Sequence, residues 1–124
     1  MLTKAKWISN PGCYATAVSL ALLPFVQHDW IDPAHIIVSA CSGITGAGKG
    51  LSEKTHHAKS NENVQLYKIH AHQHIPEIEQ TLFHMGGTEA TVSMSTHLLP
   101  INRGIMATIT VQPNDHVSED EWVN

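Results

Sequence analysis

An Asn-Pro-Gly turn directly before a run of helix-forming residues constrains this chain more than any other feature. The stretch ISNPGCYATA covers residues 8–17 and puts Cys13 where the turn ends. Proline followed by glycine favours a turn, and Tyr14, Val18, Leu22 and Phe25 then recur at helical spacing. We therefore predict a helix over residues 13–27 that begins at Cys13 and is kinked or stopped near Pro24.

A cysteine at the first position of a helix is a candidate nucleophile. The unpaired N–H groups and the dipole of a helix start favour the thiolate over the thiol. The same N–H groups can hold the oxyanion that forms when sulfur attacks a carbonyl, and Gly12 lets a substrate approach closely. The alternative is that Cys13 is a small buried hydrophobic residue. A disulfide with Cys41 is disfavoured, because secreted scaffolds usually carry more cysteines and a signal peptide.

Composition favours one ordinary globular domain. The chain has 124 residues, of which 42% are hydrophobic, and this fraction is too high for a disordered protein. Its apolar runs fall short of the roughly 20 residues that cross a bilayer, and its N-terminus lacks the apolar stretch of a signal peptide. A net charge of -4 with seven Lys and Arg residues disfavours nucleic-acid binding. We expect a soluble intracellular protein without membrane or nucleic-acid partners.

The remaining segments mix strands and helices. The expected strands are residues 5–9, 35–42, 64–70, 89–96 and 105–111, the expected helix is residues 76–83, and residues 51–63 are expected to be an exposed loop. Ser118 with Glu121 resembles the capping box of a further helix, which suggests a truncated domain. We predict an α+β fold with a mixed or antiparallel sheet covered by helices.

Three histidines are spaced two residues apart in YKIHAHQHIPEIEQ. On a strand, His70, His72 and His74 would share one face. Three imidazoles can bind zinc, although no cysteine or carboxylate at a familiar spacing completes such a set. They can instead serve Cys13 as general acid or base, or they form a polar strand edge that faces water. The residues alone leave these three alternatives open.

Two more segments carry candidate ligand-binding residues. The segment GITGAGKG lacks Ser or Thr after its lysine, so we expect a flexible glycine loop near a substrate rather than a nucleotide-binding P-loop. Arg103, the only arginine, lies in HLLPINRGI between two expected strands. Its guanidinium can clamp a carboxylate or phosphate in bidentate fashion, or it is an ordinary solvated side chain.

Together these blocks resemble the N-acetyl-gamma-glutamyl-phosphate reductase family. The stretch ISNPGCYATAVSLALLP resembles the active-site signature of that family, and SGITGAGKG, HAHQHIPEIEQ and HLLPINRGI follow in the family's order. The resemblance covers roughly residues 7–112. It implies a fold similar to the C-terminal catalytic domain of glyceraldehyde-3-phosphate and aspartate-semialdehyde dehydrogenases.

The resemblance also implies a reaction. The family reduces N-acetyl-glutamyl phosphate to N-acetyl-glutamate semialdehyde with NADPH, in arginine biosynthesis, through a thioester on the residue that matches Cys13. His74 is implied as the acid–base group, with His72 sharing the role or positioning the substrate. The residues implied to contact substrate are Arg103, Ser42, Gly43, Glu77 and Asn10.

The resemblance further implies what accompanies residues 1–124. The NADP-binding Rossmann domain of the family is expected to lie outside this chain, which is expected to be inactive alone. A cytoplasmic homodimer or homotetramer without metal is implied. Three rivals remain, namely a related acyl-phosphate semialdehyde dehydrogenase domain, a His-rich metal-binding module, and a unit that serves only oligomerisation.

Overall fold

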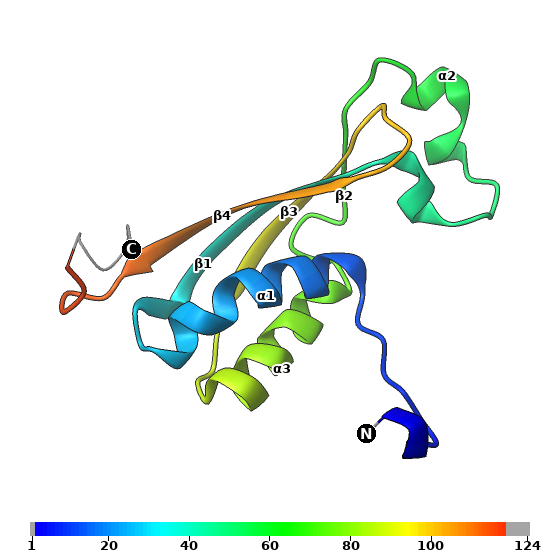
Figure 1. Cartoon of the computed structure of the whole chain (residues 1–124). Helices are drawn as coiled ribbons and strands as arrows, with labels where there is room; N and C mark the ends of the chain where they lie inside the picture. The colour runs from blue at the N-terminus through cyan, green and yellow to red at the C-terminus, as the bar shows by residue number, and fades with distance from the viewer. Residues whose placement is uncertain (1, 119–124) are drawn as a thin grey trace.

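The computed structural model of the protein describes residues 2–118. Its helical elements are η1 (Leu2–Lys4), α1 (Cys13–Gln27), η2 (Ile44–Ala47), η3 (Glu53–Thr55), α2 (His57–Ser60) and α3 (His74–Gly86). Its strands are β1 (Ile31–Ser42), β2 (Gln65–Tyr67), β3 (Val92–Leu98) and β4 (Ile105–Pro113). Figure 1 shows α1 and α3 side by side along one face of the sheet. None of the described helices is long and apolar enough to span a membrane.

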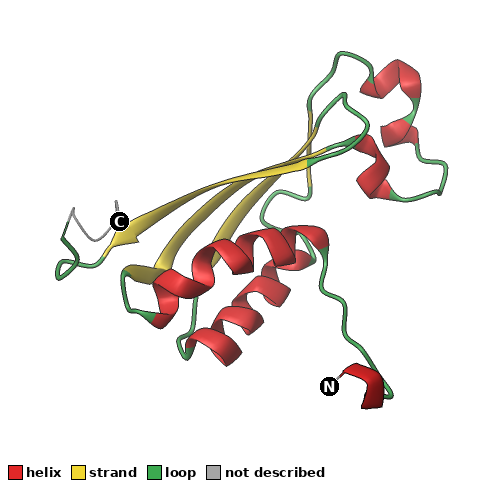
Figure 2. Ribbon diagram, viewed as in Figure 1, coloured by secondary structure: helices red, strands yellow, loops and turns green. Residues whose placement is uncertain are grey.

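The four strands form one mixed sheet in the order β2-β3-β1-β4. β1 pairs with β3 in parallel and with β4 in antiparallel orientation, and β2 pairs with β3 in antiparallel orientation. The predicted α+β class is therefore confirmed. Both long helices cover the same face of the sheet, and the opposite face carries no described helix (Figure 2).

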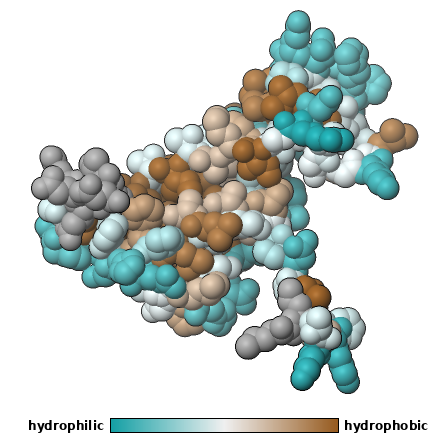
Figure 3. Space-filling view, viewed as in Figure 1, coloured by the Kyte–Doolittle hydropathy of each residue, from teal (hydrophilic) through white to brown (hydrophobic). Residues whose placement is uncertain are grey.

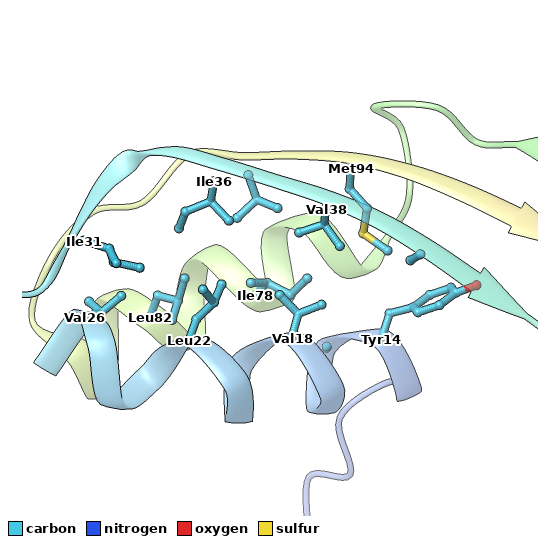
Figure 4. Close-up of a cluster of buried hydrophobic side chains, with 13 residues drawn as sticks. Tyr14, Val18, Leu22, Val26, Ile31, Ile36, Val38, Ile78, Leu82 and Met94 are labelled. Carbon is cyan, nitrogen blue, oxygen red and sulfur yellow. The ribbon is translucent and has the colours of Figure 1, made fainter. Parts of the chain in front are cut away.

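The core lies between the covered sheet face and the two helices. Along β1, Ile36 and Val38 are buried, whereas the intervening Ile37 is exposed. Val18 of α1 and Ile78 of α3 meet this face from below the sheet (Figure 4). Burial of each such aliphatic side chain contributes about 1.5–3 kcal/mol, so this layer fixes the positions of both helix starts.

Two predictions of local structure need correction. Residues 5–9 form no strand, because Trp7 and Ile8 are exposed and no described strand pairs with them. β2 has only three residues, because the chain turns at Lys68 and His70, whose φ values are 45° and 50°. The predicted end of α1 at Gln27 is confirmed, and Pro24 lies inside the helix. Glu121 of the predicted capping box lies outside the described residues.

A polar segment projects beyond the end of the sheet at which α1 begins (Figure 1). This segment, residues 43–63, carries η2, η3 and α2, and hydrophilic side chains gather over its α2 region in Figure 3. The side-chain amide of Gln65 ties it to β2 by donating to the carbonyl oxygens of Lys54 and Lys59, at 3.2 and 3.1 Å. The segment is thereby held over the same end of the sheet as Cys13.

Candidate active site

Cys13 is the first residue of α1 and is exposed. The preceding Gly12 is the N-cap residue and provides no side-chain cap. Its carbonyl oxygen accepts hydrogen bonds from the backbone N–H and the hydroxyl of Thr16, at 2.8 and 3.0 Å. The first N–H groups of the helix therefore remain available for an anion beside the thiol.

His74 is the first residue of α3. Its ring packs against Gly12, the residue that precedes Cys13. A Cβ atom on Gly12 would overlap the Nε2, Cε1 and Cδ2 atoms of the His74 ring. Glu77, in the first turn of the same helix, accepts a 3.2 Å hydrogen bond from the backbone N–H of Gly12. The residue His74 is 8% exposed, and the buried Nδ1 of its ring has no hydrogen-bond partner in the described chain. Packing therefore holds the ring in place.

His72 supports the start of α3. Its Nδ1 accepts a 3.2 Å hydrogen bond from the backbone N–H of His74, and the two ring centroids are 4.6 Å apart. Burial lowers the pKa of His72, and electrostatic interactions with His74 and Lys68 lower it further, against an opposing effect of Glu77. An imidazole that accepts at Nδ1 carries its proton on Nε2 when neutral. His72 is therefore a neutral capping group.

Tyr14 fixes both imidazoles from the side of α1. It is 2% exposed and points toward the sheet (Figure 4), and its hydroxyl lies 3.2 Å from that of Tyr67. Its ring centroid lies 5.4 Å from that of His72 and 5.9 Å from that of His74, both in edge contacts. Burial, together with the bond to Tyr67, raises the pKa of Tyr14 well above its usual range. Tyr14 therefore stays a neutral phenol.

Two cavities open on either side of Cys13 and Ser42. The first has a volume of about 540 Å³, and its wall includes Tyr14, both buried histidines and two lysines. Its lining residues are Gly12, Cys13, Tyr14, Ser42, Gly46, Ala47, Ser52, Lys54, Thr55, Gln65, Leu66, Tyr67, Lys68, His72, Gln73, His74 and Leu98. The second, of about 400 Å³, is lined by Cys13, Ser42, Gly43, Thr45, Gly46, Gly104 and Ile105. An exposed thiol, an imidazole and an uncapped helix start at the junction of two cavities suit acyl transfer.

The family model described as "Semialdehyde dehydrogenase, dimerisation domain" matches residues 13–124. The chain belongs to this family. This semialdehyde dehydrogenase dimerisation domain is 56% identical over 118 residues to an N-acetyl-gamma-glutamyl-phosphate reductase of Exiguobacterium sibiricum, covering 95% of the chain and 34% of that protein. It is 49% identical over 120 residues to the protein of that name from Halalkalibacterium halodurans, covering 97% of the chain and 35% of the relative.

A third relative with the same name, from Desulforudis audaxviator, is 46% identical over 120 residues, covering 97% of the chain and 35% of that protein. The resemblance predicted from the sequence motifs is thus confirmed. The chain spans about a third of the length of these curated relatives.

The dimerisation domain places only some of the predicted substrate residues in the walls of the two cavities. Ser42 and Gly43 line the cavities, and the Ser42 hydroxyl donates to the carbonyl oxygen of Gly43 at 2.9 Å. A Cβ on Gly43 would lie 2.7 Å from the carbonyl oxygen of Asn102, so glycine lets the two loops pair. Arg103 and Asn10 are exposed, and neither is among the described residues that line the two cavities.

The three histidines of the dimerisation domain do not share a strand face. His70 is exposed in the turn after β2, whereas His72 and His74 are buried at the start of α3. The strand prediction failed because the chain reverses at residues 68–71 before the helix begins. Within residues 2–118 no three His, Cys, Asp or Glu side chains are grouped so as to hold a metal ion.

Sequence reasoning assigned no role in the first cavity to several of its lining residues. Among them are Tyr14, noted only for its helical spacing, and Tyr67, Lys68 and Lys54. The signal for Lys68 is its place just before the histidine segment in YKIHAHQHIPEIEQ. The sequence around Lys54 does not indicate a role, because its place in the cavity wall depends on the hydrogen bond between Gln65 and the projecting segment.

The glycine loop of the domain does not fit the pyrophosphate of a dinucleotide. The helix that follows β1, η2, has only four residues. The N–H groups of Gly43, Ile44 and Thr45 donate to the carbonyl oxygens of the facing loop at Gly104, Ile101 and Asn102. A dinucleotide loop instead offers free N–H groups at the start of a full helix, so the segment after β1 is not a loop of that kind.

Proposed function

We propose that this chain is the catalytic and dimerisation domain of a cytoplasmic N-acetyl-gamma-glutamyl-phosphate reductase of arginine biosynthesis. The observation that carries the proposal is the exposed thiol of Cys13 at an uncapped helix start, with the His74 ring packed against the adjacent Gly12. The names of the relatives support the same substrate.

In the proposed reaction, the Cys13 thiolate attacks the carbonyl carbon of the acyl phosphate. The oxyanion of the tetrahedral intermediate is held by the free N–H groups that open α1. A carbon–sulfur bond forms, the bond from the carbonyl carbon to the phosphate oxygen breaks, and phosphate leaves with its electron pair. The product is a thioester on Cys13, which stays electrophilic enough for a second step.

His74 is the proposed acid–base group of this step. The Nε2 edge of its ring faces Gly12 and therefore the start of α1. It takes the proton that Cys13 loses when the thiolate forms. His72 and Tyr14 position the ring, His72 through its bond to the His74 backbone and Tyr14 through its edge contact.

The other predicted substrate contacts keep their proposed roles. Ser42 and Gly43 border the reacting carbonyl, and Glu77 holds the backbone of Gly12 in place. Arg103 stands next to Gly104, which lines the second cavity, and is proposed to meet an anionic group of the substrate from that side. Asn10, in the exposed segment before α1, is proposed as a lesser contact.

The proposed reductant is NADPH, which supplies a hydride to the thioester when it is bound. Because the glycine loop does not fit a dinucleotide, we assign the cofactor to a Rossmann domain outside this chain. This domain's own part is then the acyl transfer, and alone the chain is proposed to lack reductase activity.

A second copy of the chain is the proposed cover of the open sheet face. Ile37, Met106 and Leu66 are 58%, 61% and 58% exposed, and their strands carry no described helix on that side. The family is named for dimerisation. A homodimer through this face, or a tetramer built from such dimers, is therefore proposed.

The substrate assignment is tested with the full-length protein and a panel of acyl phosphates. NADPH oxidation is measured with N-acetyl-glutamyl phosphate and with aspartyl phosphate. A higher kcat/KM for N-acetyl-glutamyl phosphate supports the proposal. A higher value for aspartyl phosphate assigns the chain to a related semialdehyde dehydrogenase, and no oxidation with either contradicts a reductase.

A further inference from the structure

The larger cavity beside Cys13 is locally cationic in an acidic protein. The chain carries a net charge of -4. Yet Lys54 and Lys68 both line this cavity, and none of the described lining residues is Asp or Glu. Two ammonium groups without a facing carboxylate make a site that favours an anionic ligand.

Lys68 is held in place at this cavity. It follows β2 with a left-handed φ of 45°, and its Nζ donates a 3.1 Å hydrogen bond to the side-chain oxygen of Gln73, which also lines the cavity. Throughout residues 2–118 no carboxylate forms an ion pair with Lys68. An ammonium has three donors, so those not used by Gln73 remain for a ligand.

Backbone N–H groups that line the smaller cavity are already used in hydrogen bonds within the protein, so they are not free to bind an anion. The N–H groups of Gly43 and Thr45 already donate to the facing loop, and the Thr45 hydroxyl donates to the carbonyl oxygen of Asn102 at 2.6 Å. These donors are thus satisfied within the protein, whereas the two lysines that line the larger cavity form no described ion pair.

The position of Lys68 relative to the thiol indicates which anionic group of the substrate it contacts. His74 packs against Gly12, His72 lies beyond His74, and the charge of Lys68 acts on His72. Lys68 therefore lies two imidazole rings away from Gly12, the residue before the thiol. The phosphate of an acyl phosphate is bonded to the carbon that Cys13 attacks, whereas a carboxylate at the far end of the acyl chain reaches further.

We propose that Lys68, with Lys54 on the projecting segment, binds the free carboxylate of the acyl substrate and so selects dicarboxylic acyl groups. This inference rests on the proposed function, because it assigns a specificity residue to the same reaction. Gln73 orients the ammonium, and the tie from Gln65 brings the second lysine to the cavity.

The test uses the full-length enzyme in the aldehyde-oxidising direction, where aldehyde and phosphate are separate substrates. The variants are Lys68→Met, Lys68→Arg and, as a matched control, Lys59→Met, a lysine on α2 outside both cavities. The substrates are N-acetyl-glutamate semialdehyde and butanal, which lacks the carboxylate.

We expect Lys68→Met to raise KM for the semialdehyde by about 10- to 100-fold, the effect of losing a hydrogen bond to a charged group. KM for phosphate and kcat/KM for butanal should stay unchanged, Lys68→Arg should recover part of the loss, and Lys59→Met should match the native enzyme. An increase in KM for phosphate, or equal losses with both aldehydes, overturns the proposal.

A binding measurement gives a second readout without turnover. N-acetyl-glutamate should slow alkylation of Cys13 by iodoacetamide in the native enzyme and protect the Lys68→Met variant much less. Equal protection in both contradicts the proposal. If the native enzyme does not oxidise the semialdehyde at all, the proposed function fails, and this outcome differs from an active enzyme in which Lys68→Met changes nothing.

Discussion

The imidazole of His74 lies against the bare Cα of Gly12, in the space that a side chain at position 12 would fill. The two residues are 62 positions apart in the chain, as their numbers show, and they meet because α1 and α3 pack side by side beneath the sheet. A turn glycine thus lets the imidazole at the start of one helix pack beside the thiol at the start of another.

Replacing Gly12 by Ala should therefore separate His74 from Cys13. The added methyl group overlaps the ring, and the ring has no hydrogen bond from its Nδ1 to resist displacement. We expect kcat/KM of the full-length enzyme to fall by about 10²- to 10⁴-fold, the usual share of general acid–base catalysis. Gly50→Ala is the control, because nothing lies within 4 Å of a Cβ there. Near-native activity of Gly12→Ala would show that His74 does not serve the thiol from this position.

Stability should decline as the pH falls because His72 is held neutral. Its folded-state pKa lies below the unfolded value of about 6.5, so the unfolded chain binds the extra proton first. The stabilisation is complete above that unfolded value and is lost as the pH falls toward the folded pKa. His72→Asn keeps an acceptor for the His74 N–H without a titrating ring, so its thermal midpoint should vary less between pH 5 and 8.

His70→Asn provides the control for this pH series, since His70 is exposed in a turn with φ of 50°, which asparagine tolerates. It should keep the native pH dependence. A slope for His72→Asn that equals the native slope would argue against a neutral capping role.

The two cysteines should differ in reactivity toward iodoacetamide. Cys13 is exposed at a helix start, whereas Cys41 is half-buried within β1, between Met106 and His97 of the neighbouring strands. We expect Cys13 of the full-length protein to be alkylated at least about 10-fold faster, because access and a helix start both favour thiolate attack. Peptide mapping over a time course measures both rates, and equal rates would be incompatible with an activated Cys13.

A charge on the open sheet face should weaken self-association. Ser39 is exposed in the middle of β1, opposite Ser95 and Thr108 on the two adjacent strands. Ser39→Glu would bury a carboxylate in an interface formed there, so we expect a shift to a smaller species by analytical ultracentrifugation. Gln80→Glu adds a carboxylate on an exposed position of α3 and should leave the mass unchanged. An unaltered mass for Ser39→Glu would show that the interface between copies does not lie on this face of the sheet.

Local sequence signals predicted the elements that are specified by neighbouring residues. The Asn-Pro-Gly turn fixed the start of α1 at Cys13, and its predicted bounds of 13–27 are those observed. A β-branched apolar run located most of β1, and alternation of apolar and small residues located most of β4. Gly87, with φ of 80°, ends α3 near the predicted position.

The parts that could not be predicted depend on contacts between distant segments. The strand expected for the histidine segment is replaced by a turn and a helix start, in which His72 accepts from the His74 backbone. Lys68 and Tyr67 join the site only because β2 pairs with β3 beside α1. Residue spacing does not indicate which strands pair, so these members of the site can be identified only from the folded structure.

The proposed function depends on transfer of the acyl group from an acyl phosphate to Cys13. The direct measurement is intact-protein and peptide mass spectrometry of the full-length enzyme, mixed with N-acetyl-glutamyl phosphate without NADPH and quenched in acid. We expect an N-acetyl-glutamyl adduct on the Cys13 peptide, one phosphate released per adduct, and neither product with Cys13→Ser. Phosphate release at the native rate by Cys13→Ser, or an adduct on another residue, would contradict it.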